Sequence, residues 1–193
     1  FFNKTSKNEE YEILKHFLRK LRYTIEKDSS SIYLVTSNKK QEGKSFIILC
    51  LAFTLSLLKK KILIIDTNFK NNSLTRTLLP VQDKHKRIEK GNQFLLSTGE
   101  NEANESGSEK SDEKAFSESI VSATANKQIF LIGNSGDQAS PSEIFAGRDF
   151  GQMINHLRLN YDYILMEGPA LNDYSDTHEL IQYVEKIIPV FSA

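Results

Sequence analysis

The sequence has a single cysteine, no net charge and no apolar run long enough to span a membrane. Because Cys50 is the only cysteine, no disulfide framework is possible, which favours a reducing, cytoplasmic setting. The 25 basic residues are balanced by 25 acidic residues, so there is no basic footprint for nucleic acid. The longest apolar run, from Phe46 to Leu58, is shorter than the ~20 residues of a membrane span, and we expect no signal peptide.

The length of 193 residues suits one domain with its own hydrophobic core. The chain begins with Phe1 instead of methionine, and we expect it to be a piece of a longer protein. Residues 100–113 are acidic, rich in serine and asparagine and almost without apolar residues, so they cannot bury enough surface to become ordered. We therefore predict a single domain over residues 1–193 with a mobile surface insertion at about 81–114.

The chain is organised around the segment from residue 32 to residue 45. An apolar run at Ile32–Val35 predicts a buried strand, and a polar loop ending in Gly43-Lys44-Ser45 leads into the apolar run of a helix. This is the order of a P-loop, in which backbone N–H groups at a helix N-terminus face phosphates, the lysine reaches the β- and γ-phosphates and the serine binds Mg²⁺. Asn38 stands where the full pattern has glycine, but asparagine also adopts left-handed conformations. The alternative interpretation is a chance Gly-Lys-Ser between a strand and a helix.

Apolar runs alternate with helical patterns along the rest of the chain. Pro189 cannot donate a backbone hydrogen bond, which favours an edge position for the last strand. The alternation predicts a three-layer α/β fold with a doubly wound, mostly parallel sheet. Strands are expected at Ile32–Thr36, Ile62–Asp66, Ile129–Ile132, Tyr163–Glu167 and Ile187–Phe191, and helices at Glu9–Lys27, Phe46–Leu58, Ser73–Leu79, Ala115–Ala123, Ser140–Glu143, Asp149–Leu159 and Ser175–Tyr183.

Two of the predicted strands end in acidic residues. Ile62–Ile65 is continuously apolar, which is typical of a strand covered on both faces, and it is followed by Asp66. The strand from Tyr163 ends in the same way at Glu167. Since open α/β sheets bind ligands at the carboxyl ends of their strands, both residues are candidates for a site. The alternative for Asp66 is a capping or turn role.

These segments together resemble the cytoplasmic kinase domain of the bacterial tyrosine kinases and chain-length determinant proteins of capsule and exopolysaccharide assembly, within the wider group of P-loop partitioning ATPases. Residues 61–74 resemble the family's second Walker motif, 134–144 its Gly-x-x-x-x-x-Pro-Ser-Glu-Leu segment and 161–169 its Walker B strand. Arg19 and Arg22 match two arginines of a Glu-x-x-Arg-x-x-Arg helix that makes subunit contacts in a ring, with His16 in place of the glutamate.

The resemblance implies an ATP or ADP site with Mg²⁺ and assigns its residues. It implies catalytic roles for Asp66, Asn68 and Glu167, and metal coordination by Ser45, Asp66 and Glu167. The nucleotide-binding residues that it implies are Asn38, Gln41, Glu42, Gly43, Lys44, Ser45 and Phe46.

Several of these positions depart from the family's pattern. Asn68 replaces the second aspartate of the second motif, and Glu167 replaces the Walker B aspartate. A neutral asparagine cannot act as a base, and the longer glutamate disturbs the octahedral ligand geometry that Mg²⁺ requires at about 2.0–2.1 Å. Phe46 and Gln41 stand in place of the usual threonine and glycine. We therefore expect a degenerate domain with weak or absent nucleotide binding, acting in the regulation or assembly of polysaccharide chain-length control.

Two other functions remain open. One is an active ATP-dependent protein-tyrosine autokinase, and the other is a partitioning-type ATPase. The resemblance also implies attachment to the membrane-spanning part of the same protein, at the inner face of the cell membrane. It further implies self-association through the Glu9–Lys27 helix, without a nucleic-acid partner.

Overall fold

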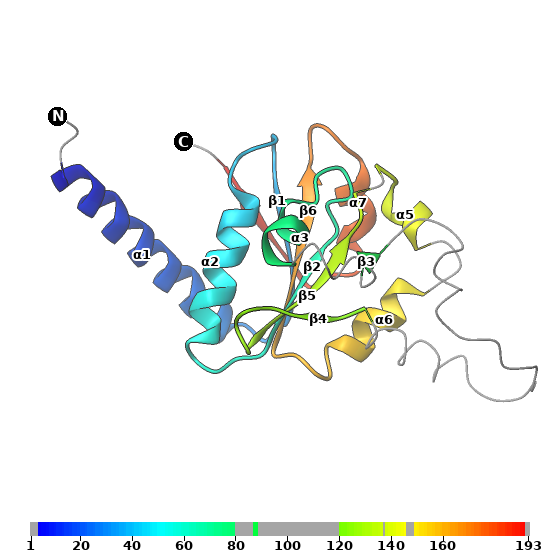
Figure 1. Ribbon diagram of the computed structural model, residues 1–193, viewed down its shortest axis with the longest axis horizontal. Coiled ribbons are helices and arrows are strands. Elements are labelled where there is room, and N and C mark those ends of the chain that lie inside the picture. The colour runs from blue at the N-terminus through cyan, green and yellow to red at the C-terminus, as the bar shows by residue number, and fades with distance from the viewer. Residues whose placement is uncertain (1–3, 80–86, 89–119, 137, 146–148, 192–193) are drawn as a thin grey trace, which may run out of the picture.

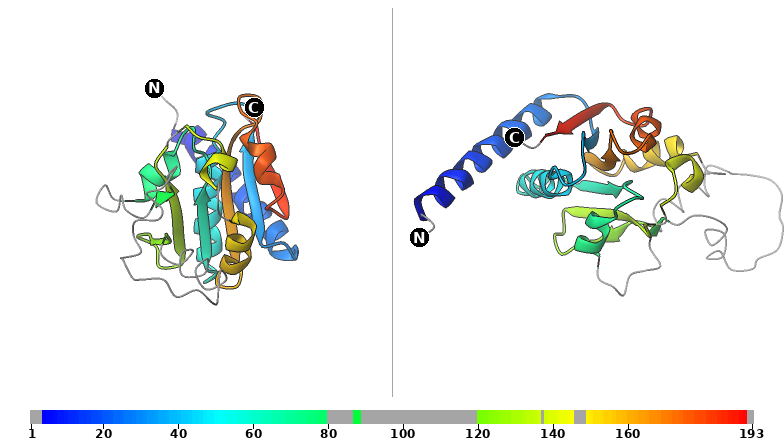
Figure 2. Two further views of the ribbon diagram at one scale, coloured as in Figure 1. Left: turned by 90° about the vertical axis from the view of Figure 1, so that its right-hand side faces the viewer. Right: turned by 90° about the horizontal axis from the view of Figure 1, so that it is seen from above.

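The computed structural model describes residues 4–79, 87–88, 120–136, 138–145 and 149–191 (Figure 1). A central sheet carries helices on both of its faces (Figure 2). The predicted insertion at about 81–114 lies outside the described residues except for Arg87–Ile88. Within the described part of the chain, no helix combines the length and the apolar character that crossing a membrane requires.

The sheet is mostly parallel, as the sequence predicts. Its order is β3-β5-β2-β6-β1-β7, and β7 lies at the edge beside β1, which confirms the position inferred from Pro189. The register of β2 against β6 brings two acidic residues together, because Asp66 at the end of β2 lies directly opposite Glu167 in β6. The strands are β1 Ile32–Ser37, β2 Ile62–Asp66, β3 Arg87–Ile88, β4 Ser122–Ala123, β5 Ile129–Asn134, β6 Tyr163–Ala170 and β7 Lys186–Val190.

One predicted element is wrong where the structure describes it. The helix expected at Ala115–Ala123 is replaced at its end by β4, which pairs antiparallel with β5, so that Ser122 lies opposite Leu131. Residues 115–119 of that prediction lie outside the described residues. The pattern of this segment is too short to separate a helix from a strand, and pairing with an available sheet edge decides its form.

The helices form two layers, one on each face of the sheet. Successive residues of a strand point alternately into one layer and the other. Val35 and Ile64 point to the layer that contains α1, α2 and α3, whereas Leu34 and Ile65 point to the layer that contains α6 and α7. Strands buried on both faces explain the continuous apolar runs in the sequence. The helices are α1 Lys4–Lys27, α2 Lys44–Ser56, α3 Ser73–Leu78, α5 Pro141–Ile144, α6 Phe150–Leu157 and α7 Asp176–Ile181. At α5 the predicted capping box is present, with Ser140 and Glu143 each bonded to the other's backbone N–H.

Two apolar helices are less buried than their patterns predict. The α1 stripe was expected to comprise Tyr11, Leu14, Phe17, Leu18, Leu21 and Ile25, but Tyr11 is 62% and Phe17 49% exposed. The N-terminal part of α1 projects beyond the sheet and its covering helices, so its apolar side has little of the chain to pack against (Figure 1). In α2, Phe46 and Phe53 also face outward, since a helix covers a sheet with one side only.

Candidate functional site

A cleft of 520 Å³ lies at the carboxyl ends of β1 and β6, beside the loop that follows β2. This is the edge of the sheet at which parallel α/β proteins bind their ligands. The cleft is lined by Lys40, Gln41, Gly43, Lys44, Ser45, Phe46, Asn68, Lys70, Asn71, Ser73, Glu167, Pro169, Ala170 and Tyr174. Five of the seven predicted nucleotide-binding residues therefore line one cleft together with two of the predicted catalytic residues.

The loop between β1 and α2 turns sharply into the helix through residues of left-handed conformation. Gly43 has a φ of +91° and Gln41 a φ of +64°, so two left-handed residues turn the chain into the start of α2. The buried Lys44 begins this helix, and its Nζ donates to Ser37 Oγ at 2.9 Å. The backbone N–H of Lys39 donates to the Glu42 carboxylate at 2.9 Å, which braces the loop.

Two predicted residues of this loop have other contacts and do not line the cleft. The carbonyl of Asn38 accepts a hydrogen bond from the backbone of Asn172 at 3.1 Å, and the carboxylate of Glu42 serves the loop itself. Asn38 thus ties the loop after β1 to the loop after β6.

The Ser45 hydroxyl and the Glu167 carboxyl form the centre of the cleft. Ser45 Oγ lies 2.9 Å and 3.1 Å from the two carboxyl oxygens, and 2.8 Å from Ser73 Oγ. Adjacent ligands of an octahedral Mg²⁺ at about 2.0–2.1 Å are themselves about 2.9 Å apart. The separation of the serine and glutamate oxygens is thus compatible with neighbouring Mg²⁺ ligands, although here it is the length of the hydrogen bond that joins them. The Asn68 amide is also at this point, with Nδ2 3.5 Å from Glu167 Oε1.

Asp66 lies behind this centre. Its carboxylate accepts from the Thr75 backbone N–H at 2.9 Å and from the Thr75 hydroxyl at 2.6 Å, and it does not line the cleft. The Asn68 backbone N–H supplies a further bond at 3.3 Å. Of the residues assigned to Mg²⁺ from the sequence, the structure brings Ser45 and Glu167 together and holds Asp66 against α3. Among the described residues, no group of three histidine, cysteine or acidic side chains is arranged to hold a metal.

Burial controls the electrostatics of these carboxyl groups. It raises the pKa of Glu167 to about 8, and the nearby Asp66 adds to this rise. Burial also raises the pKa of Asp66 to about 6, although the hydrogen bonds from Thr75 and Asn68 lower it. Desolvation lowers the pKa of the Lys44 ammonium group. Near neutral pH Glu167 therefore holds its proton, and a cation bound there would release it.

Sequence reasoning missed a second group of residues that line the cleft. Lys40 lies inside the P-loop, Lys70 lies within the second motif, and Tyr174 belongs to the loop between β6 and α7. The two lysines are near motif residues in the sequence and could have been considered. For Tyr174 no spacing rule exists, because its position depends on how its loop folds back over the strand ends.

Comparisons with known proteins agree with the fold. No protein-family model and no curated protein sequence matches the chain. Among solved structures, the VpsO kinase domain superposes with a TM-score of 0.66 at 18% identity, over 95% of this chain and 81% of that one. The kinase domain of the Escherichia coli tyrosine kinase ETK gives 0.64 at 16% identity, over 90% and 61%.

A P-loop ATPase is also similar. The septum site-determining protein MinD of Pyrococcus horikoshii, solved with Mg-ADP, superposes with a TM-score of 0.52 at 16% identity, over 83% of this chain and 57% of that one. The chain thus spans less than two thirds of the length of the ETK and MinD chains. It has the α/β fold of bacterial tyrosine kinase domains and of MinD-type P-loop ATPases.

Proposed function

We propose that this chain is a nucleotide-binding P-loop domain of a capsule or exopolysaccharide assembly protein. In this proposal its tyrosine kinase activity is lost, and it acts in regulating or assembling the machinery that sets polysaccharide chain length. The observation that carries nucleotide binding is the meeting of Lys44, at the start of α2, with the Ser45–Glu167 pair in one cleft. The lysine and the helix N-terminus suit a polyphosphate, and the pair suits Mg²⁺.

The proposed loss of phosphoryl transfer is supported by what faces the cleft. Among the described residues that line it, Glu167 is the one carboxyl group, and Asn68 beside it is neutral. Phosphoryl transfer depends on positioning and on neutralising charge in the transition state, and bound Mg²⁺ supplies much of that neutralisation. Lys44 and Ser45 can hold a nucleotide, whereas Asp66 is turned towards Thr75 and leaves the cleft without a second acid or a base.

Nucleotide binding can be tested at Lys44. We expect weak binding of ATP or ADP by isothermal titration calorimetry, and a loss of at least about tenfold in affinity on Lys44→Ala, because a charge-assisted contact to phosphate disappears. Lys39→Ala is the matched control, because Lys39 is exposed and does not line the cleft. Equal binding by the Lys44→Ala variant, or no binding by the unmodified protein, would refute the proposed nucleotide site.

The exposed side of α1 supports a proposal about partners. Ile13 is 69% and Phe17 49% exposed, and they lie four residues apart on one side of the helix. We propose that α1 mediates weak self-association and that the chain is attached to the membrane-spanning part of the same protein at the inner face of the cell membrane.

Self-association should depend on this apolar side. We expect Ile13→Ser with Phe17→Ser to shift sedimentation-velocity profiles towards monomer, because the apolar area that association buries is removed. Lys20→Ser, on the same helix, serves as the control for a serine at an exposed position that adds or removes no apolar ring or branched side chain. Identical profiles for the double variant and the unmodified protein would remove α1 from the proposed contact.

A further inference from the structure

A second cationic centre lies in the cleft, apart from Lys44. The ammonium groups of Lys40 and Lys70 lie over the ring of Tyr174, at 4.8 Å and 5.6 Å from its centroid. All three side chains line the cleft, as Lys44 does, but the Nζ of Lys44 is bonded to Ser37 at the end of β1. A polyanion that binds Lys44 therefore shares the cleft with two further positive charges.

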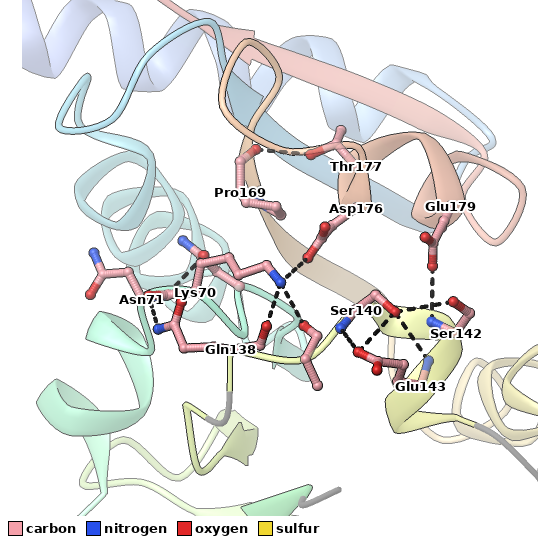
Figure 3. A network of polar contacts seen from close by, with 12 residues as sticks. Lys70, Asn71, Gln138, Ser140, Ser142, Glu143, Pro169, Asp176, Thr177 and Glu179 are labelled. Carbon is pink, nitrogen blue, oxygen red and sulfur yellow. Dashed lines mark hydrogen bonds and ion pairs between the residues drawn. The ribbon is translucent and has the colours of Figure 1, made fainter.

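The two lysines over Tyr174 differ in how their ammonium groups are bound. Lys70 Nζ donates to the carbonyl oxygens of Gln138 at 2.6 Å and Ala139 at 3.0 Å, and it pairs with the buried Asp176 at 3.5 Å (Figure 3). An ammonium group has three N–H donors, of which the two carbonyl oxygens take two, and the Asp176 carboxylate balances the charge as an ion pair. Lys70 is thus engaged in holding together the loops that surround the cleft.

Lys40 is differently placed. Its side chain is exposed, and its ammonium group lies over the ring of Tyr174. A cation–π contact at an exposed site is weaker than a charge-assisted hydrogen bond to a phosphate. A phosphate that enters the cleft can therefore draw Lys40 away from Tyr174, whereas Lys70 stays with its oxygen partners.

We propose that Lys40 binds the terminal phosphate of a nucleoside triphosphate and makes the cleft prefer triphosphates to diphosphates. The inference rests on the proposed nucleotide binding, since Lys44 and Ser45 must first hold the phosphate chain. A triphosphate carries more negative charge than a diphosphate. The exposed Lys40 ammonium lies over the Tyr174 ring with the Asp173 carboxylate near it, and it lacks the two carbonyl acceptors that hold Lys70. The third phosphate of the triphosphate consequently pairs with the Lys40 ammonium group.

The neighbouring Lys39 provides a matched control. It is exposed like Lys40, it belongs to the same loop and it carries the same charge, yet it does not line the cleft. A general effect of positive charge on anion binding would appear at both residues, but contact with a bound phosphate would appear at Lys40 alone.

The experiment compares dissociation constants of ATP and ADP, measured by calorimetry in Mg²⁺, for the unmodified protein and for Lys40→Gln, Lys40→Arg and Lys39→Gln. We expect Lys40→Gln to weaken ATP binding by about tenfold and ADP binding by less than about twofold, since one charge-assisted contact is removed from the terminal phosphate. Lys40→Arg should retain the preference for ATP, and Lys39→Gln should change neither constant. In parallel, ATP but not ADP should protect Lys40 from acetylation in mass-spectrometric footprinting, with Lys39 remaining reactive.

The outcomes separate this inference from the proposed function. If both nucleotides bind and Lys40→Gln weakens them equally or not at all, the role of Lys40 is refuted and the nucleotide site stands. If Lys39→Gln has the same effect as Lys40→Gln, the preference comes from general charge and the inference is likewise refuted. If the unmodified protein binds neither nucleotide, the proposed function fails and the inference fails with it.

Discussion

At pH 8, Glu167→Gln should raise the thermal unfolding midpoint by about 6–12 °C. Glu167 is 1% exposed, and burial raises its pKa from 4.5 to about 8, so ionising it in the folded protein is unfavourable. Glutamine keeps the shape of the protonated acid and can still bond Ser45, but it cannot become charged. The penalty that it removes is on the order of 3 kcal/mol, and each kcal/mol shifts the midpoint of a domain of this size by about 2–4 °C.

The raised pKa of Glu167 also determines whether folding stability rises or falls with pH. Between pH 4.5 and about pH 8 the folded protein keeps a proton on Glu167 that the unfolded chain releases, so stability falls as the pH rises. The stability that the protonated Glu167 contributes to the folded protein is fully present below pH 4.5 and is lost by about pH 8. Asp66, with its pKa raised to about 6, adds a slope of the same sign in the lower part of this window. In the Glu167→Gln variant, stability should therefore no longer fall with pH between pH 6 and 8, and part of the fall should remain below pH 6.

Differential scanning fluorimetry across pH 5–8.5 without Mg²⁺ measures both effects. Glu12→Gln is the control, because Glu12 is exposed on α1 and, among the described residues, pairs with Lys15 one turn away. Its midpoint should stay within about 2 °C of the unmodified protein. A Glu167→Gln variant that is less stable than the unmodified protein at pH 8 would mean that the cleft favours the carboxylate.

Much of the fold could be predicted because local patterns and tertiary packing agree. The runs at Ile62–Ile65 and Ile32–Val35 are buried on both faces, so composition alone identifies central strands. The capping box at Ser140 and the edge position of Pro189 follow from backbone hydrogen bonding, which depends on few neighbours. β4 was missed because two residues carry no periodicity, and the partner that makes them a strand is distant in the sequence.

The site was predictable where a motif fixes the backbone and not where a side chain has a choice of partner. Lys44 and Ser45 are placed by the turn at Gly43, which a strand followed by a Gly-Lys-Ser loop and a helix must make. The direction of the Asp66 carboxylate, in contrast, depends on Thr75 in α3, which offers it two donors. Register brings Asp66 beside Glu167, but hydrogen bonding decides which of them faces the cleft.

The rate of phosphate transfer from ATP to tyrosine should stay near background in the unmodified protein. It should rise by about tenfold or more when Asn68→Asp is combined with Glu167→Asp. Asn68 and Glu167 both line the cleft with 3.5 Å between Nδ2 and Oε1, so an acid at residue 68 adds its charge at the metal position. The shorter acid at residue 167 leaves room beside Ser45 for the ion. These changes act on charge that develops during transfer, so they should raise the rate more than the affinity.

Transfer of labelled phosphate from ATP to tyrosine, with and without Mg²⁺, measures this expectation. Asn71→Asp is the matched control, because Asn71 also lines the cleft but bonds Arg76 at 2.8 Å instead of Glu167. A gain in the double variant that Asn71→Asp does not reproduce would assign the lost activity to the metal position. Strong Mg²⁺-dependent autophosphorylation by the unmodified protein, abolished by Lys44→Ala, would instead identify an active kinase. In that case Ser45 and Glu167 at 2.9 Å, without a second acid, would already be sufficient to place the ion.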